Sequence, residues 1–258
     1  MGWIGKIIGG TIGLGLGGPL GAVLGAALGH RFDKSDEKYL EGYGGRSRGQ
    51  YQGFQSQQEK EMTFFVAAFS MLGKIAKADG QVSDAEVKTV EDFMDKELRL
   101  NFASKNAAVN IFRTAKNSSE SFESFARQFY QAFKGQQQIL ELMIDVLLRV
   151  AASDGDIVYN EDVLIKTAAE MFGFSDSMYE NFKQKYVKTA SSHYYAVLNC
   201  SPSDDNDKIK KQYRKLVSEY HPDKIIAKGL PEEFVDFANE KFKDIQQAYE
   251  EISRKRGM

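Results

Sequence analysis

The sequence has a single cysteine, Cys200, among 258 residues. This scarcity excludes an internal disulfide framework and any zinc module built on cysteine thiolates. Proline is also rare, with four residues, and β-branched runs are few, so the composition favours an all-α protein. The formal net charge is only -2 and the charged fraction is 27%, so the whole chain offers no electrostatic argument for nucleic-acid binding. We expect no nucleic-acid partner.

Four regions differ in composition. Residues 1–30 are apolar and glycine-rich, and residues 31–57 are polar. Residues 58–190 show helical periodicity throughout, and residues 193–258 are charged and helical. We therefore expect a single transmembrane helix, a flexible cytoplasmic linker with a reach on the order of 25–30 Å, a helical bundle and a C-terminal helical hairpin module.

The first region predicts a membrane anchor. From Ile7 to Gly29 no side chain is charged, and this length can cross a bilayer core as a helix, kinked but not broken at Pro19. A cleaved signal peptide is the alternative, but only Lys6 would form its positive region and no A-x-A-like site follows. Lysine and arginine are more frequent after the span than before it. This bias places the N-terminus outside and the bulk of the protein in the cytoplasm.

Glycine recurs at every fourth position of this region. A smooth glycine stripe lets two helix backbones approach closely in lipid, and a spacing of four suits a right-handed crossing. We expect the anchor to form a homodimer within the lipid bilayer, although a glycine-rich helix that packs against nothing is the alternative. The stripe consists of Gly5, Gly9, Gly13, Gly17, Gly21, Gly25 and Gly29.

Residues 58–190 contain one pattern twice. Each copy has an apolar helical run, an Asp-Gly break, an aliphatic residue and then a glutamate. Glycine ends a helix readily because it adopts a left-handed backbone, and Ser83 with Glu86 has the pattern of a capping box. Further helices at about 102–116, 120–134 and 175–190 complete a seven-helix domain. The matched positions are Asp79 and Asp154, Gly80 and Gly155, Val82 and Ile157, and Glu86 and Glu161.

This repeat resembles the TerB family of tellurite-resistance proteins, whose fold is all-helical. Carboxylates bind hard cations, so Asp79, Glu86, Asp154 and Glu161 are candidate metal ligands if the repeat brings them together. Their spacing does not match an EF-hand loop, and acids at turns and helix starts commonly have a structural role alone, which we favour. The region has no histidine and no nucleophile motif, so we expect neither catalysis nor a cofactor.

Residues 193–258 predict three helices. A short run beginning at His193 ends at Asn199, and a final helix is expected from about Glu232 to Arg254. The helix between them ends near Tyr220, where His221-Pro222-Asp223 predicts a loop because proline cannot continue a helix. One face of this helix is apolar. The other face carries Lys208, Lys210, Lys211, Arg214 and Lys215.

This module is similar to the J domain of DnaJ-type co-chaperones in its YYAVL opening, basic second helix, HPD tripeptide and KFKDIQQAYEEI closing helix. The resemblance implies that the basic helix with His221, Pro222 and Asp223 binds a DnaK-type chaperone and stimulates its ATP hydrolysis. The protein itself would then not be an enzyme. A cationic face that only maintains solubility is the alternative. Asn199 departs from the family, which commonly has glycine there.

The order of anchor, linker, TerB-like domain and J domain resembles the DjlA type of membrane DnaJ-like co-chaperones. This resemblance implies a single-pass protein of the inner membrane of Gram-negative bacteria, with its J domain in the cytoplasm. A different function remains open, namely a membrane stress-response protein whose TerB-like domain binds a metal ion or a signalling partner.

Overall fold

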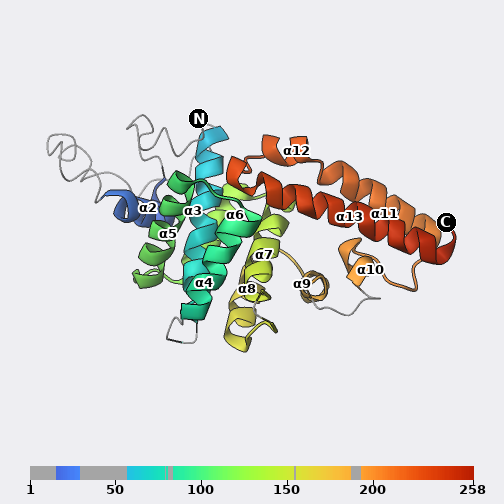
Figure 1. Ribbon diagram of the computed structural model, residues 1–258, viewed down its shortest axis with the longest axis horizontal. Coiled ribbons are helices and arrows are strands. Elements are labelled where there is room, and N and C mark those ends of the chain that lie inside the picture. The colour runs from blue at the N-terminus through green and yellow to red at the C-terminus, as the bar shows by residue number, and fades with distance from the viewer. Residues whose placement is uncertain (1–15, 30–56, 79, 81–83, 154, 187–192) are drawn as a thin grey trace.

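The computed structural model describes residues 16–29, 57–78, 80, 84–153, 155–186 and 193–258 (Figure 1). All regular elements in these ranges are helical, which confirms the predicted all-α class. Most of the helices form a bundle, and an elongated pair projects from one side of it (Figure 1).

The middle bundle, as we call helices α3 to α9, has the seven helices that the sequence predicts within the described residues. They are α3 (Gln57–Ile75), α4 (Asp84–Asp92) with its π-helical continuation η1 (Phe93–Glu97), α5 (Phe102–Asn117), α6 (Phe122–Phe133), α7 (Gln137–Ala151), α8 (Tyr159–Met171) and α9 (Asp176–Gln184).

The C-terminal module, as we call the elements from α10 onward, contains the projecting pair. Its elements are α10 (His193–Val197), α11 (Asn206–Glu219), α12 (Pro222–Ala227), the 3-10 helix η2 (Glu232–Phe234) and α13 (Val235–Arg256). Asn199, after α10, has a φ of 52°, so it adopts the left-handed turn for which glycine is the usual residue.

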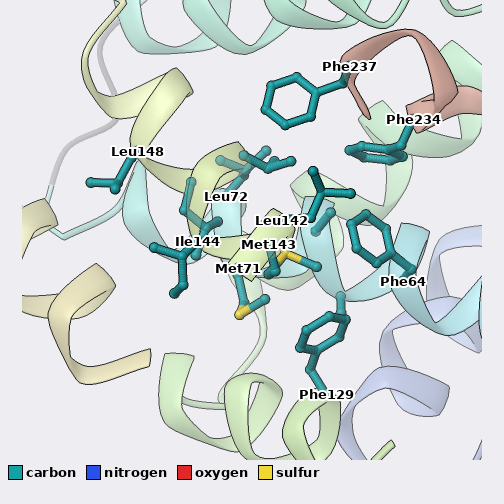
Figure 2. Close-up of a cluster of buried hydrophobic side chains, with 14 of the residues drawn as sticks. Phe64, Met71, Leu72, Phe129, Leu142, Met143, Ile144, Leu148, Phe234 and Phe237 are labelled. Atoms are coloured by element: carbon teal, nitrogen blue, oxygen red, sulfur yellow. The ribbon is translucent and has the colours of Figure 1, made fainter. Parts of the chain in front are cut away.

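The core forms around α3 and α7, the two helices whose sequences are apolar on nearly all sides. Residues 62–73 of α3 and residues 139–148 of α7 are all buried. Gly73 allows α5 to approach α3, because a Cβ at this glycine would lie 2.6 Å from the carbonyl oxygen of Phe112. Figure 2 shows side chains of both helices, among them Met71 and Met143, meeting in this core.

The repeated turns are described in part. Gly80 and Gly155 have φ angles of 97° and 141°, in agreement with their predicted role as helix-ending residues. Asp79, Asp154 and residues 81–83 lie outside the described residues, and so does the predicted capping box. The last helix of the bundle is shorter than predicted, since it ends at Gln184. The following Lys185 and Tyr186 instead contact α7 with their side chains.

The apolar region is represented by α2 (Gly18–Gly29), which follows Leu16 and Gly17. Pro19 lies in the first turn, where proline is tolerated, and so it does not kink a longer helix as predicted. Within the described ranges no helix has both the length and the apolar character needed to cross a membrane. Residues 1–15, with Gly5, Gly9 and Gly13, lie outside those ranges, as do residues 31–56 of the predicted linker.

One face of α2 packs on α3, α5 and α6. Leu20, Val23 and Leu24 are buried there. The buried amide of Gln128 accepts a hydrogen bond from the main-chain N–H of Leu20 at 2.8 Å and donates one to the carbonyl oxygen of Gly17 at 2.7 Å. Among the described glycines of the stripe, a Cβ at Gly17 or Gly25 would meet nothing within 4 Å, and one at Gly21 would meet only the backbone of Leu16 in the same segment. Self-association through the stripe stays a prediction.

The bundle and the C-terminal module share one hydrophobic core. Phe234, just before α13, is fully buried, with its ring centroid 4.9 Å from that of Phe64 and 6.0 Å from that of Phe69. One turn along the chain, Phe237 contacts Phe93 at 6.0 Å. Figure 2 shows Phe234 beside Phe64. The module is therefore attached to the bundle by aromatic packing.

We predict that Phe234→Ala destabilises the protein by about 3–5 kcal/mol, because it removes a buried ring and leaves a cavity that the bundle cannot close. Urea unfolding measures the change. Phe102→Ala is the matched control, since that ring is 83% exposed at the start of α5 and its loss should change stability by less than about 0.5 kcal/mol. Equal effects of the two substitutions would contradict the shared core.

Candidate partner-binding site

Helix α11 is positioned by its cap and by its apolar face. The Asp205 side chain accepts a hydrogen bond from the main-chain N–H of Lys208 at 2.7 Å, which starts the helix. Tyr213 stacks on Tyr249 of α13 with ring centroids 4.0 Å apart. Ile209 and Leu216 are buried. The two helices consequently lie side by side (Figure 1), with the apolar face of α11 packed against α13.

The five predicted cations do not share one environment. Lys211, Arg214 and Lys215 are exposed, and their spacing of three and four residues places them on one face. No ion-pair partner is recorded for these three among the residues that the structure describes. Lys208, in contrast, lies 2.6 Å from the carboxylate of Asp204, and this hydrogen bond raises the pKa of its ammonium. Lys210 is partly buried.

The HPD motif, His221-Pro222-Asp223, connects α11 to α12. The prediction that the whole tripeptide lies in a loop was wrong, because Pro222 is the first residue of α12. Proline suits this position, since its missing N–H would have no helical partner there and its φ is already helical. His221 caps the helix by accepting a hydrogen bond at Nδ1 from the main-chain N–H of Asp223 at 3.3 Å.

The motif is accessible to another protein. The Asp223 side chain is 88% exposed and that of His221 is 50% exposed. The His221 ring contacts the ring of Phe242 in α13 edge to face, with centroids 5.9 Å apart. The histidine is thus held in place by the cap and by the α13 contact, and the aspartate carboxylate points into solvent.

Tyr220, the residue before the motif, has the opposite environment. It is buried, and its hydroxyl interacts with the Glu141 carboxylate of α7. Its ring lies below the ammonium of Lys241, at 4.4 Å from the centroid. Burial and the nearby Glu141 carboxylate raise the pKa of the Tyr220 hydroxyl well above its ordinary value. This side chain therefore links the HPD motif to the middle bundle.

Glu141 belongs to a buried charge cluster, which we define as Glu141, Asp145, Lys185 and Lys241. The Lys241 ammonium donates to both carboxylates, to Glu141 Oε1 at 3.1 Å and to Asp145 more closely still. Lys185 lies 3.5 Å from Glu141 and 3.8 Å from Asp145. Burial alone would raise the pKa of Glu141, but the two ammonium groups outweigh it and lower that pKa to about 2.

Local sequence patterns do not predict this cluster. Its signal was the presence of two acids one turn apart in α7, a helix that is otherwise apolar. Buried carboxylates require cationic partners, and the partners here come from α13 and from the residue that follows α9. Because these elements are distant from α7 in the chain, local periodicity cannot predict which cations are the partners.

A cleft of about 840 Å³ opens beside the cluster, between α7, η1 and α13. Its charged side chains are largely paired, since Arg149 lies 2.9 Å from Glu97, Arg99 3.9 Å from Asp236 and Lys243 2.6 Å from Glu240. The cleft therefore shows no preference for an ionic ligand of either sign.

The predicted metal ligands are only partly described. Asp79, Asp154 and the side chain of Glu86 lie outside the described residues. Glu161 accepts a hydrogen bond from the main-chain N–H of Val158 at 3.4 Å, as a helix-capping residue does. In the part of the chain that the structure describes, no group of three or more His, Cys, Asp or Glu residues is placed to hold a metal ion.

Comparison with known proteins identifies three family models along the chain. Residues 1–50 match the co-chaperone DjlA transmembrane domain, residues 65–184 match tellurite resistance protein TerB, and residues 193–257 match the DnaJ domain. These are the families, in the same order, that the sequence resemblances suggested.

Whole-chain relatives carry the name "Co-chaperone protein DjlA". The relative from Vibrio cholerae is 34% identical over 283 residues, which cover 98% of this chain and 98% of the relative. The relative from Escherichia coli K12 is 32% identical over 227 residues, which cover 79% of this chain and 83% of the relative. No solved structure matches the chain.

We predict that Asp145→Asn destabilises the protein by roughly 3–5 kcal/mol, because one buried carboxylate would then face two ammonium groups. Chemical denaturation measures the effect. Asp92→Asn is the control, since Asp92 pairs with Lys96 on the exposed surface, and its unfolding midpoint should remain almost unchanged. Similar midpoints for the two variants would show that the cluster contributes nothing to folding.

Acid should weaken the folded state through Glu141. Its pKa falls from an ordinary 4.5 in the unfolded chain to about 2 in the fold, so its contribution is complete above about pH 4.5 and is lost as the pH falls towards 2. We predict that the free energy of unfolding of Glu141→Gln, measured in urea between pH 5 and 3, depends less steeply on pH than that of the native protein. Parallel pH profiles would contradict this assignment.

Proposed function

The chain belongs to the DjlA family of membrane-anchored co-chaperones, and from this premise we propose that its C-terminal module binds a DnaK-type chaperone and stimulates ATP hydrolysis by that partner. The protein would contribute no catalytic group of its own. The observation that supports this role best is the exposed HPD motif at the end of a helix with three exposed cations, none of which has an ion-pair partner among the described residues.

The proposed binding surface combines two kinds of contact. One exposed face of α11 carries Lys211, Arg214 and Lys215. His221 follows the C-terminal end of the same helix. Cations in this arrangement steer a partner with an acidic surface and make association sensitive to salt. Asp223 provides a carboxylate that can accept a charge-assisted hydrogen bond from a cation of the partner. Lys208 and Lys210 are expected to contribute less, because one is paired and the other is partly buried.

His221 and Pro222 act as positioning residues in this proposal. The cap at His221 Nδ1 and the proline ring fix the backbone at the start of α12 and so determine where the Asp223 carboxylate points. No proton transfer by the histidine is required, since the chemistry takes place on the partner.

Orientation and assembly form part of the same proposal. The excess of lysine and arginine after the apolar region supports an N-terminus outside the inner membrane and a C-terminal module in the cytoplasm, where ATP is available. The glycine stripe supports a homodimer formed within the lipid bilayer.

We predict that Asp223→Asn and His221→Gln in the full-length protein reduce stimulation of the partner's steady-state ATP turnover by about tenfold or more. Each change removes a hydrogen bond that involves or orients a charged group. Asp207→Asn is the matched control, because Asp207 is also exposed but lies in the first turn of α11, at its other end. Full stimulation by Asp223→Asn would refute the proposed function.

A further inference from the structure

The HPD motif is attached on both sides to the middle bundle. On the N-terminal side, Tyr220 directly follows α11 as its C-cap residue, and its main-chain N–H donates to the carbonyl oxygen of Leu216 at 2.8 Å. Its side chain is 3% exposed, and its hydroxyl interacts with the Glu141 carboxylate of α7. The next residue along the chain is His221. The buried Tyr220 side chain therefore fixes the backbone immediately before the motif.

Tyr220 interacts with more than one charged group. Lys241 of α13 lies over its ring at 4.4 Å, and the same ammonium donates to Glu141 and Asp145. Both carboxylates belong to α7, so the groups that surround the tyrosine are oriented by the middle bundle and not by the C-terminal module alone. Charged hydrogen-bonding groups allow far fewer orientations than an apolar contact of the same area.

On the C-terminal side, α12 is attached as well. Lys228 donates to the side-chain oxygen of Gln138 at 2.6 Å, and Gln57 of α3 donates to the carbonyl oxygen of Ile226 at 2.8 Å. Gly229, with a φ of 104°, passes so close to Lys60 that a Cβ would lie 2.5 Å from the Lys60 Cβ. The short segment that contains the motif is thus held at both ends by contacts with α3 and α7.

We propose that the middle bundle orders the HPD motif for its partner, with Glu141 as a positioning residue that acts through Tyr220. This inference rests on the proposed function and adds a role for the TerB-like part of the chain. A partner that binds only the ordered motif has an apparent affinity equal to its intrinsic affinity multiplied by the fraction of molecules in which the motif is ordered. The anchored tyrosine keeps that fraction high before the partner arrives.

The test compares two tyrosines in the full-length protein. Tyr220→Phe removes the hydroxyl that interacts with the Glu141 carboxylate and retains the aromatic ring. Tyr179→Phe is the matched control, because the Tyr179 hydroxyl also donates to a carboxylate, that of Asp162 at 2.7 Å, but within the bundle. We expect Tyr220→Phe to raise the co-chaperone concentration for half-maximal stimulation about tenfold with an unchanged maximum. Tyr179→Phe should leave both quantities at their native values.

A second measurement needs no partner. Amide hydrogen exchange at residues 220–227 should become faster in Tyr220→Phe and keep its native rate in Tyr179→Phe. Only the first change weakens the contact that orders the HPD motif. Glu141→Gln completes a double-mutant cycle. If Glu141 acts through Tyr220, the double variant Glu141→Gln with Tyr220→Phe should need no higher concentration for half-maximal stimulation than Glu141→Gln alone.

The outcomes separate the two proposals. If the native protein stimulates the partner and Asp223→Asn does not, while Tyr220→Phe matches the native protein in stimulation and exchange, the positioning role is overturned and the co-chaperone function stands. If the native protein gives no stimulation but Tyr220→Phe still speeds exchange at residues 220–227, the motif is ordered by the bundle and the proposed function fails.

Discussion

A buried ammonium group dictates how the two folded parts of this protein join. Lys241 is withdrawn from water at the junction, and an isolated cation in that position would be very unfavourable. Glu141 and Asp145 compensate it, and because they lie one turn apart on α7 they face the same direction. Their spacing sets where along α7 the helix α13 can lie, and the buried ring of Phe234 at the start of α13 gives a second point of attachment.

Two points of attachment leave the C-terminal module little freedom to rotate against the bundle. On the side of the HPD motif that faces the bundle, Tyr220 and α12 contact α7 and α3. On the side that faces solvent lie Asp223 and the exposed cations of α11. Under the proposed function, a partner would meet the motif from this outer side, and the junction would pass the orientation of the bundle on to the binding site.

Much of this fold follows from periodicity in the sequence. The apolar runs predicted α3 and α7, the two-sided pattern predicted α11, and the predicted end of the first short helix at Asn199 agrees with the positive φ of that residue. These features are local, since they depend on residues within a few turns of one another.

The remaining features depend on contacts between distant residues. Nothing near Tyr220 in the sequence indicates that its hydroxyl would interact with Glu141. Nothing near Gln184 indicates that α9 ends there and that the next two side chains contact α7. The HPD tripeptide was interpreted through the rule that proline ends a helix, whereas Pro222 begins one, as proline also does. The candidate metal ligands depend on two aspartates that lie outside the described residues.

The shared core has a consequence for how such proteins can diverge. Phe234 and Lys241 belong to the module by sequence, but their environments are built from α3 and α7 of the bundle. A J domain inherited from another protein would arrive without matching residues at these two places. In this lineage, recombination that exchanges one part alone should be disfavoured, and the two parts should evolve as a single unit despite resembling separate families.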